Sequence, residues 1–226
     1  MPGQKQKAFI KIYREQYPVD PRKDFDHAGT MVCWHKRYEL GDEQPKETNS
    51  DWLQSLAESL PGGDSVAYWY NRAQDEDNPA YSEKMMDKAI ERVLENALLL
   101  LPLYLYDHSG ITMSTSNTGY PFTCPWDAGQ VGWIYITKED ALKTFNRKRV
   151  GKRLRLRIWD LLEAEVDEYD HYLTGAVYCF TLQDEDGEDI DGCSGFYEDV
   201  QSVVKYVRAE YAQTYNVSPD YEFLVG

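Results

Sequence analysis

The sequence predicts an α+β fold, with a mostly antiparallel sheet and several helices packed on it. Apolar runs typical of strands and amphipathic runs typical of helices both occur, but without the strict alternation expected around a parallel sheet. The turn DEDG at 184–187 joins two strand-like runs as a hairpin. Of the 226 residues, 42% are hydrophobic and 14% are aromatic, which is enough for a packed core. We expect a single domain over residues 1–226, with 41–80 as the segment best placed to be an insertion.

Two strands and a helix are expected near the start of the chain. Residues 7–13 (KAFIKIY) and 30–37 (TMVCWHKR) are rich in the β-branched and aromatic side chains that strands favour. Asn49 or Ser50 then caps a short amphipathic helix, DWLQSLAESL, which ends at a Pro-Gly-Gly sequence.

The middle of the chain combines a long helix with three strands. Residues 65–70 (SVAYWY) form either another strand or an exposed aromatic patch. Apolar residues then recur at helical spacing over 81–100, which predicts a helix. Strands are expected at 101–106, 110–114 and 131–137, around a Gly-, Ser- and Thr-rich segment.

The last third of the chain contributes helices and a hairpin. Thr137 caps a short helix, KEDALKTF, and a long charged helix with a buried apolar stripe follows at 151–172. A strand at 175–183 leads through the DEDG turn into a return strand at 188–194. A last helix is expected over 199–215.

The net charge of −15 and the pI near 4.7 bear on the class of partner. Such a chain repels phosphate backbones, so direct nucleic-acid binding is disfavoured. The expected partners are basic proteins, including proteins that bind nucleic acid. Plain solubility is the alternative interpretation of the same charge.

Cysteine usage and hydropathy favour a reducing cytosol. The four cysteines form no CxxC pair, and the chain starts MPGQKQK, without a secretory leader. Cys33 and Cys179 lie in apolar strand-like runs and are expected in the core. The longest apolar run, 97–106, is much shorter than the ~20 residues of a membrane span. We expect no membrane association and no cofactor.

The stretch 101–139 holds the residues that could form a catalytic site. Asp107 and His108 could ligate a divalent metal or act as an acid–base pair. Ser109 could serve as a hydrolase nucleophile, and Cys124 is the best thiol nucleophile if His108 folds against it.

A structural interpretation competes with each of these roles. Neighbouring residues of a strand point to opposite faces, so Asp107 and His108 cannot usually share a site. No nucleophile-elbow motif surrounds Ser109. The segment TCPWD can instead be a tight turn in which Trp126 packs inward and Asp127 caps backbone amides. We therefore favour a protein that is not an enzyme.

Two acidic blocks are the leading candidates for partner binding. One surrounds the hairpin turn and the other lies on the long helix. Neither has the order of ligands and glycine found in an EF-hand, although weak calcium binding and a simply solvated hairpin are alternatives. The candidate contact residues are Asp184, Glu185, Asp186, Glu188, Asp189 and Asp191 of the hairpin, and Glu163 and Asp167 of the helix.

A basic run precedes the second acidic block. Seven cations occur within eleven residues: Arg147, Lys148, Arg149, Lys152, Arg153, Arg155 and Arg157. They could form a local phosphate-binding patch. Alternatively, they start a helix and pair with acidic neighbours.

Four sequence blocks resemble a family of bacteriophage, prophage and mobile-element proteins. The blocks are GTMVCWHKRYELGDEQP at 29–45, LPLYLYDHSGITM at 101–113, PFTCPWDAGQVGWIYITKE at 121–139 and YDHYLTGAVYCFTL at 169–182. The family carries no established activity, so the resemblance assigns no catalytic residues. It implies a small accessory protein that an invading element expresses in the cytoplasm of a bacterial host. Such proteins often disable host defences.

Two function hypotheses follow. The first is an acidic accessory protein that binds and inhibits a nucleic-acid-handling host defence protein, of the restriction or CRISPR type, by mimicking the charge of nucleic acid. The alternative is a small metal-dependent or Cys/His hydrolase-like enzyme with a site around Asp107, His108 and Cys124.

Overall fold

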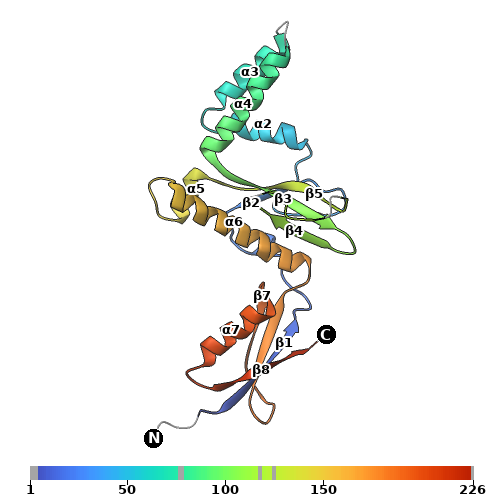
Figure 1. The fold of residues 1–226 in the computed structure, drawn as a ribbon, viewed down its shortest axis with the longest axis vertical. Coiled ribbons are helices and arrows are strands. Elements are labelled where there is room, and N and C mark those ends of the chain that lie inside the picture. Colours follow the sequence, from blue (N-terminus) through green and yellow to red (C-terminus); the bar gives the residue numbers. More distant parts are fainter. Residues whose placement is uncertain (1–4, 76–78, 117–118, 124–125, 225–226) are drawn as a thin grey trace. The chain divides into compact units, whose positions relative to one another are not determined.

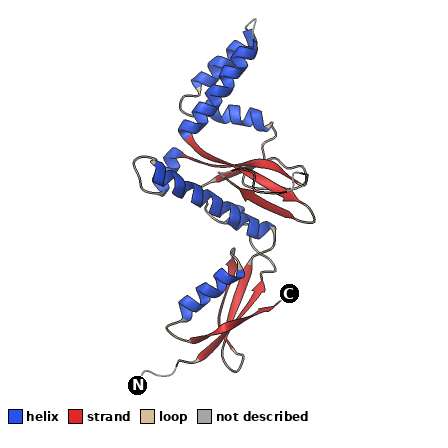
Figure 2. Cartoon of the chain, in the orientation of Figure 1, coloured by secondary structure: helices blue, strands red, loops and turns tan. Residues whose placement is uncertain are grey.

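A computed structural model describes residues 5–75, 79–116, 119–123 and 126–224 and confirms the α+β class. Its internal contacts divide the chain into two compact units, each built around a four-stranded sheet (Figures 1 and 2). Unit 1 comprises the residues up to Phe25, Ser109–Thr112 and the residues from Asp167 onward. Unit 2 comprises Asp26–His108 and Met113–Val166.

The sheet of unit 1 joins strands from the two ends of the chain. Its order is β7-β6-β1-β8, with β1 antiparallel to β6 and parallel to β8. The strands are β1 (Lys7–Arg14), β6 (Tyr178–Gln183), β7 (Asp189–Phe196) and β8 (Asn216–Leu224). Successive residues along β1 and β6 face opposite sides of this sheet.

Helix α7 (Val200–Tyr211) covers one side of the unit 1 sheet. Asp199 caps it, accepting hydrogen bonds from the amides of Gln201 at 2.8 Å and Ser202 at 3.0 Å. The shared core consists of apolar residues from β1, β6 and α7: Ala8, Ile10, Ile12, Tyr178, Phe180, Leu182, Val203, Val204 and Val207. One turn, α1 (Pro21–Asp24), also belongs to this unit.

The sheet of unit 2 has the order β2-β5-β3-β4. Its strands are β2 (Thr30–Cys33), β3 (Leu98–Asp107), β4 (Ile111–Thr115) and β5 (Ala128–Thr137). β5 pairs antiparallel with both β2 and β3, and Leu101 lies opposite Ile134. Leu99, Leu101, Leu103 and Leu105 are all buried, as expected when every second residue faces a core.

Helix α6 (Lys152–Leu173) supplies a buried stripe to the core of unit 2: Leu154, Ile158, Leu162 and Val166. Gly29 marks how closely this helix approaches the sheet. A Cβ at this position would lie 2.5 Å from Leu162 Cδ2 and 3.0 Å from Ile134 Cγ1. The short helix α5 (Lys138–Thr144) follows β5, and Thr137 caps it as predicted.

Three helices extend unit 2 between β2 and β3, overlapping the segment 41–80 that the sequence suggested as an insertion (Figure 1). They are α2 (Asn49–Ser59), α3 (Asp64–Asp75) and α4 (Pro79–Ala97). Their own small core comprises Ala57, Val66, Val93, Leu94 and Leu98. Among the described helices, none is both long and apolar enough to cross a bilayer.

Several local predictions were wrong. Residues 65–70 form part of helix α3 and not a strand, although Tyr68 and Tyr70 are exposed. The helix predicted over 81–100 ends at Ala97, because Leu98 already pairs with Thr137 in the sheet. Thr48, and neither Asn49 nor Ser50, caps α2. The last helix ends at Tyr211, and strand β8 was not predicted at all.

Candidate functional site

The predicted catalytic pair lies at the end of β3, where Asp107 and His108 have different partners. The Asp107 carboxylate accepts a hydrogen bond from Arg37 Nη2, and His35 Nε2 lies 3.9 Å from the same oxygen. His108 Nδ1 lies 3.5 Å from Asp127 Oδ2. Strand β3 ends at Asp107, so His108 already lies in the turn that follows. Asp107 is therefore held by Arg37, with His35 beside it, and not by His108.

Arg37 and His35 form an organised group with Tyr38. Backbone amides of Arg37 and Tyr38 donate to His35 Nδ1 at 3.3 Å and 3.2 Å. In a neutral His35 ring, Nδ1 is then the acceptor and the proton lies on Nε2, the atom that faces Asp107. The hydrogen bond and charge of Asp107 raise the pKa of the Arg37 guanidinium above its usual value. Sequence reasoning missed this group, although its signal was the cationic and aromatic segment WHKRY directly after a strand.

The other catalytic candidates occupy turns or lie outside the described residues. Ser109 has a positive φ of 59° in the exposed β3–β4 turn. Cys124 lies outside the described residues. Trp126 is 92% exposed, so the expectation that it packs inward was wrong: it lies two residues ahead of β5, beyond the strand pairs that begin at Ala128.

The described part of the chain offers neither a reactive buried thiol nor a cluster of metal ligands. Cys33 and Cys179 are buried, as predicted, and burial raises the pKa of the Cys179 thiol to about 11. That thiol is protonated at neutral pH and is a poor nucleophile. No group of three or more His, Cys, Asp or Glu side chains is placed to hold a metal ion among the residues described.

The acidic β6–β7 hairpin has an ordered turn. Asp184 Oδ1 accepts hydrogen bonds from the amides of Asp186 at 2.9 Å and Glu188 at 3.0 Å. Gly187 has a φ of 83°, the left-handed conformation that favours glycine. Asp184 thus shapes the turn, and it presents Glu185, Asp186 and Glu188 to solvent.

Three further acidic candidates differ in their surroundings. Asp191 accepts hydrogen bonds from the Tyr211 hydroxyl at 2.6 Å and the Gly192 amide at 2.8 Å, and these lower its pKa. Asp167 lies on the exposed side of α6, yet nearby protein displaces enough water to raise the pKa of its carboxyl, an effect that His171 partly offsets. Glu163 is half-buried on the same helix.

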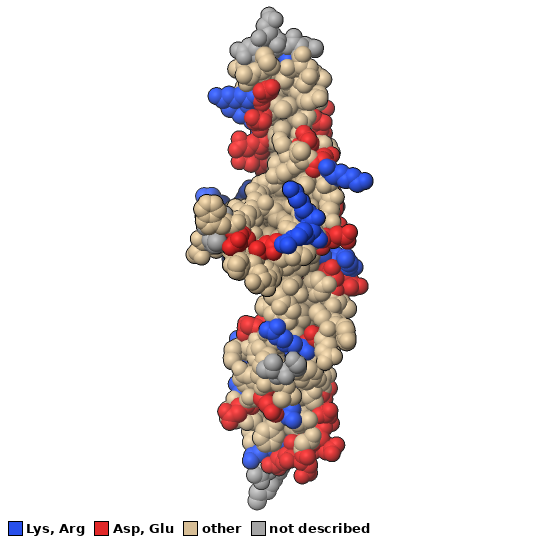
Figure 3. All heavy atoms as spheres, turned by 90° about the vertical axis from the view of Figure 1, so that its right-hand side faces the viewer, with Lys and Arg blue, Asp and Glu red and all other residues tan. Residues whose placement is uncertain are grey.

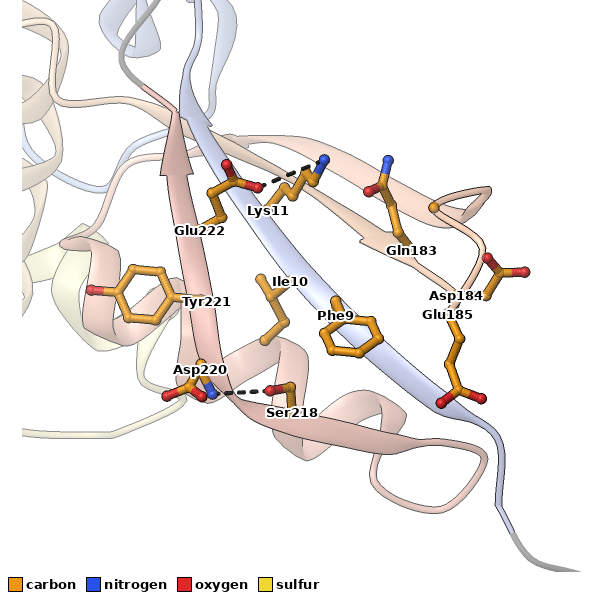
Figure 4. A pocket seen from close by; sticks show the side chains of 11 residues that line it. Phe9, Ile10, Lys11, Gln183, Asp184, Glu185, Ser218, Asp220, Tyr221 and Glu222 are labelled. Carbon is orange, nitrogen blue, oxygen red and sulfur yellow. Dashed lines mark hydrogen bonds and ion pairs between the residues drawn. The ribbon is translucent and has the colours of Figure 1, made fainter.

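A groove of about 410 Å³ adjoins the acidic turn in unit 1 (Figure 4). Strands β1 and β8 and the β6–β7 turn contribute its walls. Figure 4 shows Lys11 beside Glu222 on the neighbouring strand, their charged groups 3.7 Å apart, with Phe9 further along β1. The lining residues are Phe9, Ile10, Lys11, Gln183, Asp184, Glu185, Gly187, Ser218, Asp220, Tyr221 and Glu222.

This groove combines negative charge with apolar surface. Asp184, Glu185, Asp220 and Glu222 contribute carboxylates, and Lys11 is the one cation of the lining. Phe9 is 41% exposed. A lysine or arginine of a partner could lay its aliphatic stem along such a ring while its charge meets the carboxylates.

Comparison with protein-family models, with curated proteins and with solved structures finds no match.

Proposed function

We propose that the protein is a bacteriophage or mobile-element accessory protein that binds and inhibits a basic host defence protein in the bacterial cytoplasm. The target handles nucleic acid, as restriction and CRISPR-type proteins do, and the acidic hairpin with its groove takes the place of nucleic-acid charge. The residues proposed to contact it are Glu185, Asp186, Glu188 and Asp189, with Asp184 holding the turn.

The observation that carries the proposal is the weak neutralisation of the hairpin. Among the described residues, Asp186 and Glu188 have no side-chain hydrogen bond or ion pair. Glu185 has one ion pair, with Lys7 at 3.7 Å, and both side chains are about 60% exposed. Such exposed pairs contribute little to stability, so a partner's cation can replace Lys7. Figure 3 shows groups of acidic side chains toward the lower end of unit 1, with fewer basic side chains between them.

The groove beside the hairpin supplies what charge alone cannot. Exposed carboxylates steer a basic partner and raise its association rate, but buried aromatic contacts usually provide most of the affinity. Phe9 lines the groove, is 41% exposed and is available for such contacts. We therefore expect binding that weakens steeply with salt but keeps a salt-insensitive remainder.

The test is capture of host proteins at low and high salt with two matched variants. The first variant combines Glu185→Gln, Asp186→Asn and Glu188→Gln. The control combines Glu83→Gln, Asp87→Asn and Glu91→Gln, which make the same charge change at exposed positions of α4. We expect a basic nuclease or nucleic-acid-binding protein to be retained by the parent and the control but not by the hairpin variant.

Inhibition is then measured on the captured protein. The parent should suppress its cleavage or binding of nucleic acid, and the hairpin variant should need at least tenfold more protein for the same effect. Equal potency of the hairpin variant and the parent would remove the hairpin from the mechanism. Equal loss in both variants would mean that only net charge matters.

A further inference from the structure

A second charged feature, of opposite sign, lies in unit 2. A pocket of about 470 Å³ is lined by Arg147, Arg153, Leu154 and Arg157. The chain reverses between α5 and α6 to build it. Asn146 adopts a positive φ of 48°, and the Arg147 amide donates to the Leu142 carbonyl at 2.9 Å. The reversal places Arg147 beside the first turns of α6, whose exposed side carries the other two arginines.

The cations of this region have no acidic partners. Within the described chain, none of the seven basic residues of the run 147–157 forms an ion pair with a carboxylate. Two of the guanidinium groups lie over aromatic rings: Arg157 is 5.0 Å from the centre of Phe145 and Arg155 is 5.8 Å from that of Trp159. The interpretation that acidic neighbours neutralise this run is therefore wrong.

The positive charges of this run destabilise the amino-terminal end of helix α6. The amino terminus of a helix carries partial positive charge and is stabilised by acidic side chains. The first turn of α6 has no acidic residue, and Lys152 and Arg153 lie there instead. Arg153 and Arg157 are also four residues apart, where like charges repel. Departures from local rules of this kind are typical of functional sites, and a bound anion would relieve both conflicts.

The pocket chemistry selects phosphate among anions. Guanidinium groups donate in planar forks, and three of them around one pocket suit a tetrahedral phosphate better than a planar carboxylate. Four further cations flank these arginines in the sequence, more than a single phosphate requires: Lys148, Arg149, Lys152 and Arg155. A single strand has half the axial charge density of a duplex, so the chain's net charge of −15 opposes it less.

We propose that Arg147, Arg153 and Arg157 bind one phosphate of a single-stranded nucleic acid, and that the flanking cations bind its neighbours. This goes beyond the proposed function, because the acidic groove selects cationic partners and this pocket selects anionic ones. It also revises the expectation, drawn from net charge, that direct nucleic-acid binding is disfavoured.

The test is fluorescence anisotropy of a labelled 12-nucleotide strand, titrated with full-length protein at several salt concentrations. The variant combines Arg147→Gln, Arg153→Gln and Arg157→Gln. The control combines Lys84→Gln, Lys88→Gln and Arg92→Gln, three exposed positions of α4 with the same total charge change. We expect at least a tenfold loss of affinity in the pocket variant only. The slope of log affinity against log salt should fall by about 0.7, because the three arginines together contact one phosphate.

Further measurements keep the outcome decisive. The pocket variant should unfold at the same or a higher temperature than the parent, because like-charge repulsion is removed. Inorganic phosphate should compete with the strand. Equal losses in the two variants, or no binding of the strand by the parent, would overturn the proposal. So would a poly-glutamate peptide that binds the pocket as tightly as the strand, since the site would then select carboxylates.

Discussion

At the scale of single residues, Glu165 shows that an acidic side chain of α6 can serve the fold. It is 7% exposed, and its carboxylate accepts hydrogen bonds from the amides of Ala28 at 2.8 Å and Gly29 at 3.1 Å. Replacement by leucine would leave two amides without this acceptor, and each such loss costs about 1–3 kcal/mol. We expect Glu165→Leu to lower the free energy of unfolding by about 2–6 kcal/mol in urea denaturation.

Two companion variants separate lost hydrogen bonds from lost charge. Glu165→Gln keeps one acceptor oxygen and should be clearly less destabilising than Glu165→Leu. Asp160→Leu changes an exposed residue of the same helix and should stay within about 0.5 kcal/mol of the parent. Similar losses for Glu165→Leu and Asp160→Leu would contradict the role of the buried carboxylate.

The residues of the candidate catalytic site could be chosen from the sequence, but their partners could not. Asp107 and His108 were identified by type and by position after an apolar run. Arg37, which binds Asp107, lies 70 residues earlier in the chain. Its approach depends on β2 and β3 flanking β5 in one sheet. That pairing is non-local, and local spacing carries no information about it.

At the scale of elements, Tyr211 links α7 to the strand after the acidic turn. Its hydroxyl donates to Asp191 at 2.6 Å, and this bond helps to lower the pKa of Asp191. A carboxyl group whose pKa is lower in the folded than in the unfolded protein stabilises the fold at pH values above its unfolded pKa, which is about 3.9 for Asp. This stabilisation is lost as the pH falls through the pKa of the folded state. We expect Tyr211→Phe to lower the urea midpoint at pH 7 but to leave it almost unchanged at pH 2.

Tyr206→Phe is the matched control for that experiment. Tyr206 lies on the same helix, its ring packs 5.4 Å from Phe196, and it is 47% exposed. Its variant should match the parent at both pH values. A loss in Tyr211→Phe that is equally large at pH 2 would show that ring packing, and not the bond to Asp191, couples the helix to the strand.

Elements with a strong local signal were predicted well, and the exceptions have physical causes. The β6–β7 hairpin and α6 follow from turn chemistry and apolar periodicity. Strand β8 contains Pro219 and polar residues, and pairing with β1 at the edge of the sheet creates it. Helix α3 carries the aromatic run SVAYWY, which favours a strand locally. Packing of Val66 against α4 instead selects the helix.

At the scale of the whole molecule, the order of the chain hides the division into units. β1 pairs with β6 and β8, so both ends of the chain build unit 1, while most of unit 2 comes from the residues between them. No linker composition marks these boundaries, because β1 leads through α1 into β2 and helix α6 runs on across residue 167. A single sequence therefore predicts the fold class but not which segments pack together.

The division makes a prediction about an internal fragment. Residues 26–173 contain all of unit 2 and the whole of α6, including the buried residues Leu101, Ile134 and Leu162. Because these cores need no residue from either end of the chain, we expect the fragment to fold alone. It should show helix and strand signals in far-ultraviolet circular dichroism and one cooperative thermal transition.

Ile134→Asp buries a charge at a position with no solvent exposure and should abolish that transition. A fragment whose spectrum matches that of its Ile134→Asp variant would show that unit 2 depends on the chain ends for its stability.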